Sequence, residues 1–252
     1  MKKLKSRLIS KLNISSSHRG STLIEMVVSF TLLAIFLSTA TIIISNVTNL
    51  YYHVRGESYA RQVGDIITQK ITSEVASARY SQTNSNYNPC IYKESELTVG
   101  DHDRVAGNSI AFYDGTDTRV RIFASYLTAQ DYANGADAKD DGVFQIYYYP
   151  ITDENDSNND RVGTYWTFDK KVYNGYKITR LNFAPANSAL NESLAAEYNI
   201  ADVKAADYPS NVMAVYMTLK SEKYGEYNIC RFVKMYDYPE KTDLIVVKDK
   251  EN

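Results

Sequence analysis

The sequence is poor in the residues that most catalytic and metal sites require. Among its 252 residues are two cysteines and three histidines, which excludes a disulfide-dense scaffold and a cysteine-rich zinc site. It has no glycine-rich phosphate loop, no His-Glu-x-x-His run and no Cys-x-x-Cys pair. A catalytic triad would have to use His102, and no neighbouring residues complete one. We therefore expect a protein that is not an enzyme and needs no cofactor.

The sequence also lacks a strong net charge. Its 28 Lys and Arg residues nearly balance 30 Asp and Glu residues, whereas a nucleic-acid-binding protein carries a basic face. The charge is uneven, because residues 1–20 contain six basic residues and no acidic one. This leader carries +6, and the remaining chain, with 22 basic and 30 acidic residues, carries −8. We expect no nucleic-acid partner and two segments of opposite charge.

A long apolar run follows the basic leader. No Asp, Glu, Lys or Arg occurs in residues 26–54, and residues 26–44 are almost wholly apolar. Nineteen residues of helix span about 28 Å, close to the thickness of a bilayer core. A basic leader before such a run orients the N-terminus toward the cytoplasm. The sequence thus predicts a single-pass protein of the cytoplasmic membrane with its acidic bulk outside.

Ordinary targeting signals explain this segment incompletely. A cleaved secretory signal could use residues 26–37 as its apolar region and 38–40 as its cleavage site, but residues 42–44 continue the apolar run. An uncleaved anchor accounts for everything except Glu25. A carboxylate opposes insertion by roughly 2.5–3.5 kcal/mol at the bilayer centre, so Glu25 should have a partner. A capping box from Thr22 to Glu25 is one explanation that needs no function.

The residues around Glu25 offer a functional explanation. Residues 18–28, His-Arg-Gly-Ser-Thr-Leu-Ile-Glu-Met-Val-Val, resemble the prepilin signal of type IV pilins and type II secretion pseudopilins. In that family a prepilin peptidase cleaves after the Gly that ends the leader, and the new N-terminal residue is methylated. The resemblance assigns these roles to Gly20 and Ser21, and it assigns Glu25 to the fifth mature position, which the family fills with Glu. Ser21 departs from the Phe of many members, and the resemblance extends to about residue 80.

The resemblance implies an assembly role for Glu25. Cleavage after Gly20 creates an ammonium group on Ser21, with which the Glu25 carboxylate of a neighbouring subunit can pair when the helices bundle. A buried charge without its partner is unfavourable by several kcal/mol, so this pairing would select one axial stagger. The implied partners are the prepilin peptidase, other pilin or pseudopilin subunits, and a platform protein with its ATPase.

Beyond the membrane run, the helix is expected to continue to about residue 80. An apolar stripe recurs every three to four residues, formed by Val63, Ile66, Ile67, Ile71, Val75 and Ala78. Gly56 and Gly64 each weaken a helix by about 1 kcal/mol relative to Ala, so local softness is expected there. Residues 80–89, rich in Ser and Asn and ended by Pro89, predict the stop.

From Cys90 onward the periodicity is that of strands. Seven segments rich in β-branched and aromatic residues are expected to be strands: 109–113, 119–125, 143–149, 164–168, 176–183, 212–219 and 227–236. Residues 220–226, which contain Gly225, predict a hairpin turn. A short helix is expected between residues 184 and 208, and an edge strand or a tail at 243–247. The 22 tyrosines suit both sheet packing and contact surfaces.

The predicted fold class is α+β, with a long N-terminal helix packed on an antiparallel β-sheet head. Three segments are expected along the chain. They are a cleaved leader at 1–20, a helix at 21–80 whose transmembrane part is about 26–44, and an extracytoplasmic β-rich domain at 81–252.

Two further candidate sites lie in that domain. Cys90 and Cys230 would be outside the cytoplasm, where a disulfide closing so long a loop would add roughly 4–5 kcal/mol; the alternative is two buried thiols. Asp153, Asn155 and Asp160 offer oxygens as at the start of a calcium loop, but the Gly at the sixth position and the Glu at the twelfth are missing. A solvated acidic loop is the favoured interpretation, so no metal is expected.

Two functions of different classes remain. The resemblance implies a structural subunit, and the mature length of 232 residues, large for a repeating subunit, favours a minor pilin or pseudopilin of a pilus, type II secretion or competence filament. The alternative is a single-pass surface protein whose β-rich domain binds a ligand or host surface without polymerising.

Overall fold

The computed structural model describes residues 23–81, 88–93, 104–127, 132–133, 135, 141–149, 164–236, 238 and 245–248. The chain divides into two compact units, residues 1–51 and 52–252. We call them the N-terminal unit and the head unit, and describe each by itself. Helix α2 (Leu23–Val75) has residues in both.

In the N-terminal unit, α2 is an apolar helix with no core of its own. From Leu23 to Leu50 every side chain is exposed except that of Ala40, which is half-buried. The helix is long and apolar enough to cross a membrane. Four threonine hydroxyls donate to the carbonyl four residues earlier at 2.8–2.9 Å: Thr31, Thr39, Thr41 and Thr48. These polar groups are therefore satisfied within the helix, as a hydrocarbon environment requires.

In the head unit, one face of α2 is buried along a stripe with helical spacing. Its buried residues are Gly56, Ala60, Val63, Gly64, Ile67, Ile71 and Val75. The predicted stripe is confirmed at four positions and wrong at Ile66, which is 40% exposed. Ala78 is buried, but α2 has already ended at Val75. The chain leaves the helix there because Ala78 bridges to Asp114 and the Arg79 N–H donates to the Tyr113 carbonyl at 2.7 Å.

The larger sheet has the strand order β10-β1-β3-β4-β5-β6, with β2 paired to β4. Its strands are β1 (Cys90–Tyr92), β2 (Arg104–Val105), β3 (Ser109–Tyr113), β4 (Arg119–Tyr126), β5 (Phe144–Tyr149), β6 (Thr164–Thr167) and β10 (Val246–Lys248). All pairs are antiparallel except β1 with β10, which is parallel. The C-terminal segment is therefore an edge strand and not a tail. The short strands β1 and β2 had no sequence signal.

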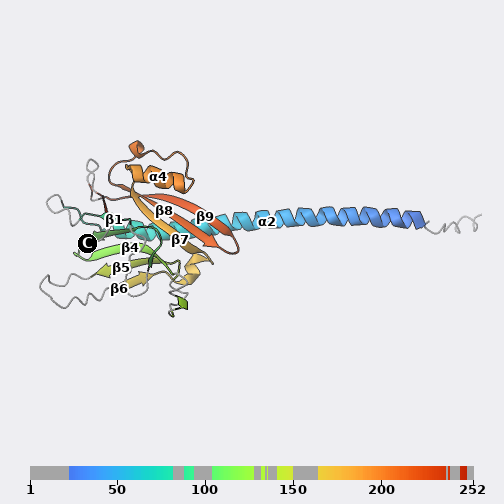
Figure 1. Ribbon diagram of the computed structural model, residues 1–252, viewed down its shortest axis with the longest axis horizontal. Coiled ribbons are helices and arrows are strands. Elements are labelled where there is room, and N and C mark those ends of the chain that lie inside the picture. The colour runs from blue at the N-terminus through green and yellow to red at the C-terminus, as the bar shows by residue number, and fades with distance from the viewer. Residues whose placement is uncertain are drawn as a thin grey trace, which may run out of the picture. The chain divides into compact units, whose positions relative to one another are not determined.

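The smaller sheet contains β7 (Lys177–Pro185), β8 (Val212–Ser221) and β9 (Gly225–Lys234), all antiparallel. The predicted hairpin turn joins β8 to β9, and Gly225 takes the left-handed φ of 87° that a side chain would oppose. The predicted short helix is α4 (Ala189–Glu197), which covers the outer face of this sheet (Figure 1). Two 3₁₀ turns complete the described elements: η3 (Lys170–Tyr173) and η4 (Ala205–Asp207). The seven expected strands thus belong to two sheets, not one.

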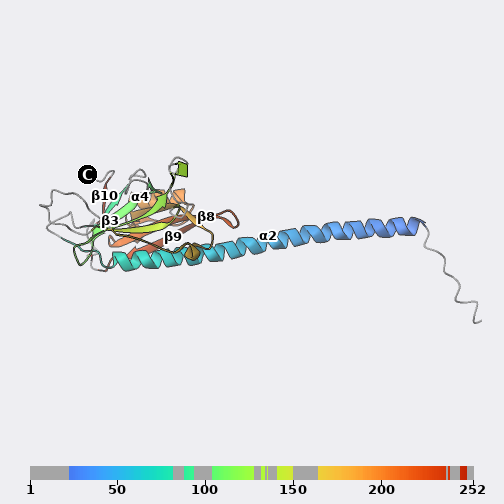
Figure 2. The same cartoon turned by 90° about the horizontal axis from the view of Figure 1, so that it is seen from below.

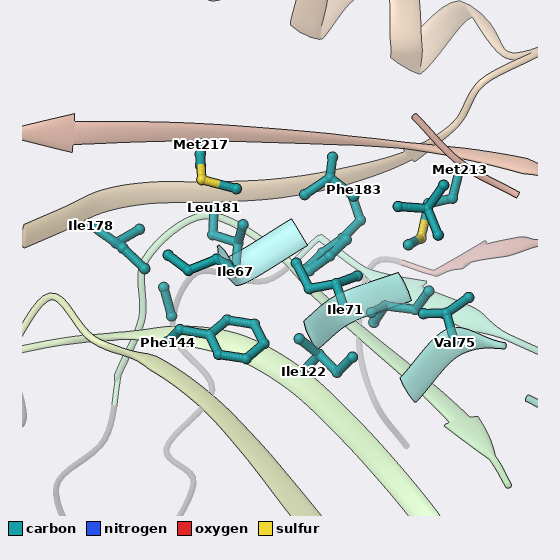
Figure 3. Packing of buried hydrophobic residues seen from close by; sticks show 14 of the residues in the cluster. Ile67, Ile71, Val75, Ile122, Phe144, Ile178, Leu181, Phe183, Met213 and Met217 are labelled. Atoms are coloured by element: carbon teal, nitrogen blue, oxygen red, sulfur yellow. The ribbon is translucent and has the colours of Figure 1, made fainter. Parts of the chain in front are cut away.

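The main core forms where the head-unit part of α2 packs against both sheets. In Figure 1 this part of the helix lies between the β7–β9 sheet and strands β4–β6, and Figure 2 shows it running along one side of the head unit. Ile67 and Ile71 point between Phe144 of the larger sheet and Leu181 of the smaller one (Figure 3). One helix face therefore closes the space between the two sheets.

Asn108 joins the sheets directly. Its Nδ2 donates to the Phe183 carbonyl at 2.8 Å, and its Oδ1 accepts from the Phe183 N–H at 2.6 Å. The Asn108 N–H donates to the Leu181 carbonyl at 3.1 Å. A buried amide that satisfies both backbone groups of Phe183 holds β7 against the segment before β3.

Candidate functional site: the N-terminal helix and the tyrosine cluster at its head-unit end

Glu25 lies in the first turn of α2, and its side chain is exposed. A carboxylate at this position interacts favourably with the unbonded N–H groups and the positive end of the helix dipole. Thr22, the proposed capping partner, lies outside the described residues, so the capping box stays a prediction. Gly20 and Ser21 also lie outside them.

Three tyrosines surround Gly56, where α2 enters the head unit, and we call Tyr176, Tyr224 and Tyr227 the tyrosine cluster. The Tyr176 hydroxyl donates to the Gly56 carbonyl at 2.8 Å. A Cβ at Gly56 would stand 2.7 Å from the Tyr224 Cβ and 2.8 Å from the Tyr227 hydroxyl. Gly56 therefore leaves room for the cluster, while the local softness of the helix there stays a prediction.

Tyr227 extends the cluster one turn toward the N-terminus of the helix. Its hydroxyl donates to the His53 carbonyl at 3.0 Å, and its ring stacks on the His53 ring with centroids 5.9 Å apart. Further along α2, a Cβ at Gly64 would stand 2.5 Å from Cδ1 of Ile229. Both glycines thus allow the smaller sheet to approach the helix backbone closely.

The hydroxyls of Tyr176 and Tyr227 remain hydrogen-bond donors at physiological pH. Burial raises the pKa of Tyr176 to about 12. Burial, and secondly the charge of Glu57, raise the pKa of Tyr227. A folded-state pKa above the unfolded value of about 10 gives a contribution to stability that is complete below pH 10 and is lost as pH rises toward 12. These tyrosines are therefore structural donors and not proton carriers near neutral pH.

The decisive comparison concerns the segment that leads into α2. Residues 15–41 match the family model described as the prokaryotic N-terminal methylation motif. The chain carries a type IV pilin-like signal. This motif is typical of type IV pilins and pseudopilins and implies processing by a prepilin peptidase. No curated protein and no solved structure matches the chain.

The pilin-like architecture follows from combining the motif with the fold. The motif contains Gly20, Ser21 and Glu25 and reaches into the exposed apolar part of α2. The same helix continues into the head unit, where it packs on antiparallel sheets. Among the described residues, one helix is long and apolar enough to span a membrane, which is consistent with a prepilin anchored in the inner membrane.

The two cysteines do not form the disulfide that was one of the two sequence alternatives. Both are thiols. Cys90 lies in β1 of the larger sheet beside Tyr92 and Ala111, whereas Cys230 lies in β9 of the smaller sheet and packs on the α4 side with Tyr216. The two positions belong to different sheets, which sequence spacing cannot reveal. Burial raises the pKa of the Cys230 thiol to about 11, so it is a poor nucleophile at neutral pH.

The remaining candidates from the sequence are the calcium loop and the catalytic histidine. Asp153, Asn155, Asp160 and His102 lie outside the described residues, and the calcium hypothesis therefore stays a prediction. Among the described residues, no group of three or more His, Cys, Asp or Glu side chains could hold a metal ion.

The tyrosine cluster contained the site residues that sequence analysis missed. Its members come from two sheet-forming segments more than 100 positions after the helix, and they were counted only as general sheet tyrosines. A usable signal existed in Gly56 and Gly64, since two glycines at eight-residue spacing on the stripe indicate close approach.

Replacing Tyr176 by Phe tests the cluster. Losing the hydrogen bond to the Gly56 carbonyl is expected to lower the free energy of unfolding by about 1 kcal/mol. Tyr236→Phe is the matched control, because Tyr236 is 73% exposed and its change should have no measurable effect. Urea unfolding of the detergent-solubilised chain measures both. Equal stabilities for the two variants would show that the Tyr176 hydroxyl contributes nothing.

Proposed function

We propose that this chain is a structural subunit, a minor pilin or pseudopilin, of a type IV pilus-like filament. The observation that carries the proposal is the methylation motif at residues 15–41 running directly into an exposed apolar helix that continues into a folded head unit. A helix without buried residues in its apolar half needs either lipid or other helices around it. A filament subunit uses both environments in turn.

Maturation is proposed to occur between Gly20 and Ser21, with N-methylation of Ser21. The +6 leader is then removed in the cytoplasm, and the −8 mature chain has its head unit outside. Before assembly, the subunit is held in the cytoplasmic membrane with its N-terminus on the cytoplasmic side. A platform protein and its ATPase then draw it into the filament at the cell surface.

Glu25 is proposed to set the register between subunits. Its carboxylate would pair with the Ser21 ammonium of a neighbour in a helix bundle from which water is excluded. A buried charge without its partner is unfavourable by roughly 3–5 kcal/mol. The bundle is therefore stable only in the register in which the carboxylate and the ammonium group are in contact. The proposal is supported by the position of Glu25 in the first turn of α2 and by its separation of four residues from Ser21 in the sequence.

The proposal is tested by determining the N-terminus and mass of the chain in cells with and without the prepilin peptidase. The 252 residues have a mass of 28.5 kDa, so removal of 20 residues lowers the mass by about 2 kDa. In cells with the prepilin peptidase, N-terminal sequencing should begin at Ser21 and mass spectrometry should show one added methyl group. In cells without the peptidase, the heavier chain should accumulate in the membrane.

Two other N-termini would decide against it. A chain that begins at Met1 in both strains is an uncleaved anchor and supports the surface-protein alternative. A chain that begins at Thr41 is the product of an ordinary secretory signal. Subunit stoichiometry in purified filaments then separates a minor from a major subunit.

A further inference from the structure

The turn between β8 and β9 reaches the part of α2 where the charge-free run ends. That run ends at Val54, and Arg55 is the first charged residue after it. Lys223 of the turn has its Nζ 5.4 Å from the ring centroid of Tyr52 and 5.2 Å from that of Tyr224. A lysine 171 positions later in the chain than Tyr52 is thus held beside the helix where the charge-free run ends.

These residues form one edge of the head unit, and we call Tyr52, Arg55, Lys223 and Tyr224 the lipid-side edge. Tyr52 is 40% exposed, and Arg55 and Lys223 are exposed. The Arg55 guanidinium donates to the Tyr59 hydroxyl at 2.7 and 2.9 Å, which keeps this cation beside the aromatic rings. Tyrosine side chains together with basic ones are typical of the headgroup level of a membrane.

The nearby carboxylates have basic neighbours of their own. Glu57 pairs with Arg61 at 2.6 Å. Glu222 acts on Lys177, whose pKa is raised first by Asp141 and also by Glu222. Glu226 stands opposite Lys220 in the β8–β9 register, where opposite charges attract. Glu57 and Glu226 therefore each have a basic residue beside them, other than Lys223 of the lipid-side edge.

We propose that the lipid-side edge binds the phosphate groups of anionic lipids while the subunit is held in the membrane. The inference rests on the membrane-held state proposed above and adds a second attachment of the head unit, besides the helix, to the bilayer. Lys223 supplies the charge, and the rings of Tyr52 and Tyr224 supply the amphipathic surface that suits the headgroup layer. Extraction into a filament would then require this contact with lipid to be released.

Hydrogen exchange of the full chain in lipid nanodiscs tests the proposal. Amides of residues 221–226 should exchange about fivefold more slowly in phosphatidylglycerol than in phosphatidylcholine, a factor that corresponds to one lysine attracted to an anionic surface. Lys223→Gln should abolish the difference. Lys234→Gln, at the far end of β9 and also exposed, should retain it.

Other results of this experiment would overturn the lipid-binding proposal, and only one of them would also overturn the proposed function. Equal exchange in the two lipids, or equal behaviour of the two lysine variants, would overturn the inference while leaving the insertion of the chain and the proposed function intact. If inorganic phosphate added to the chain in detergent slows the turn to the same extent, the edge binds free phosphate and not lipid, which also overturns it. Failure of the chain to insert into nanodiscs would overturn both the inference and the proposed function.

Discussion

Glu25→Ala is expected to remove the subunit from filaments while leaving it in the membrane. The substitution deletes the carboxylate that would neutralise a neighbour's Ser21 ammonium inside the helix bundle. Breaking a buried ion pair by removing one partner is unfavourable by roughly 3–5 kcal/mol, so incorporation should fall by at least about 100-fold. Insertion should be unchanged or improved, because an apolar residue replaces a charged one at the start of the apolar run. Immunoblots of sheared filaments and of washed membranes measure the two quantities.

Two control variants sharpen the Glu25 experiment. Glu25→Gln keeps the shape of the side chain and removes its charge, so it should fail like alanine if charge pairing is the cause. Glu57→Ala removes another acidic residue of α2, one whose ion pair with Arg61 is at the surface, and should assemble normally. Normal incorporation of Glu25→Ala would refute the pairing argument.

Ile67→Ala is expected to lower the stability of the head unit by roughly 2–5 kcal/mol. Ile67 has no solvent exposure and lies between Phe144 and Leu181, on opposite sheets, so a cavity there loosens both (Figure 3). Trp166, the one tryptophan of the chain, reports on unfolding by fluorescence. The Nζ of Lys70 on α2 lies 4.4 Å from the centre of the Trp166 ring, so the ring changes environment when the larger sheet separates from the helix.

Ile66→Ala is the matched control for the core. The residue type, the helix and the substitution are the same, but Ile66 is 40% exposed. A surface substitution of this kind should change the free energy of unfolding by no more than about 0.5 kcal/mol. Equal losses at positions 66 and 67 would contradict the orientation of α2 in the head unit.

The difference in exposure between Ile66 and Ile67 shows what residue spacing can predict about burial and what it cannot. Spacing of three to four residues located the buried stripe, since the stripe depends on neighbours within two turns of one helix. The predicted end of the helix, at about residue 80, lies beyond its observed end at Val75. Adjacent isoleucines differ by about 100° around the helix axis, and the pattern alone did not decide which one the sheets cover. The same limit applies to the strands, whose positions were predicted but whose division into two sheets was not.

Some residues of the candidate site were predicted from the sequence, and others were found only in the structure. Gly20, Ser21 and Glu25 were assigned from a short contiguous motif, and the family match at residues 15–41 covers these positions, while their individual roles stay predictions. The tyrosine cluster and the lipid-side edge bring residues after 170 to the helix at 52–56, and no local pattern predicted that meeting. The separate sheets of Cys90 and Cys230 were equally invisible.

Residue types and their local order were enough to predict the methylation motif, the apolar span, the opposite charges of residues 1–20 and of the chain after them, and the α+β class. Each of these depends on residue type and on neighbours within a few positions, because membrane transfer and helix or strand periodicity are local properties. The division of the strands between two sheets, the close packing at Gly56 and the position of Lys223 beside Tyr52 became apparent only in the folded molecule. Those features arise from contacts between distant segments, whose pairing is selected by the packing of the whole core.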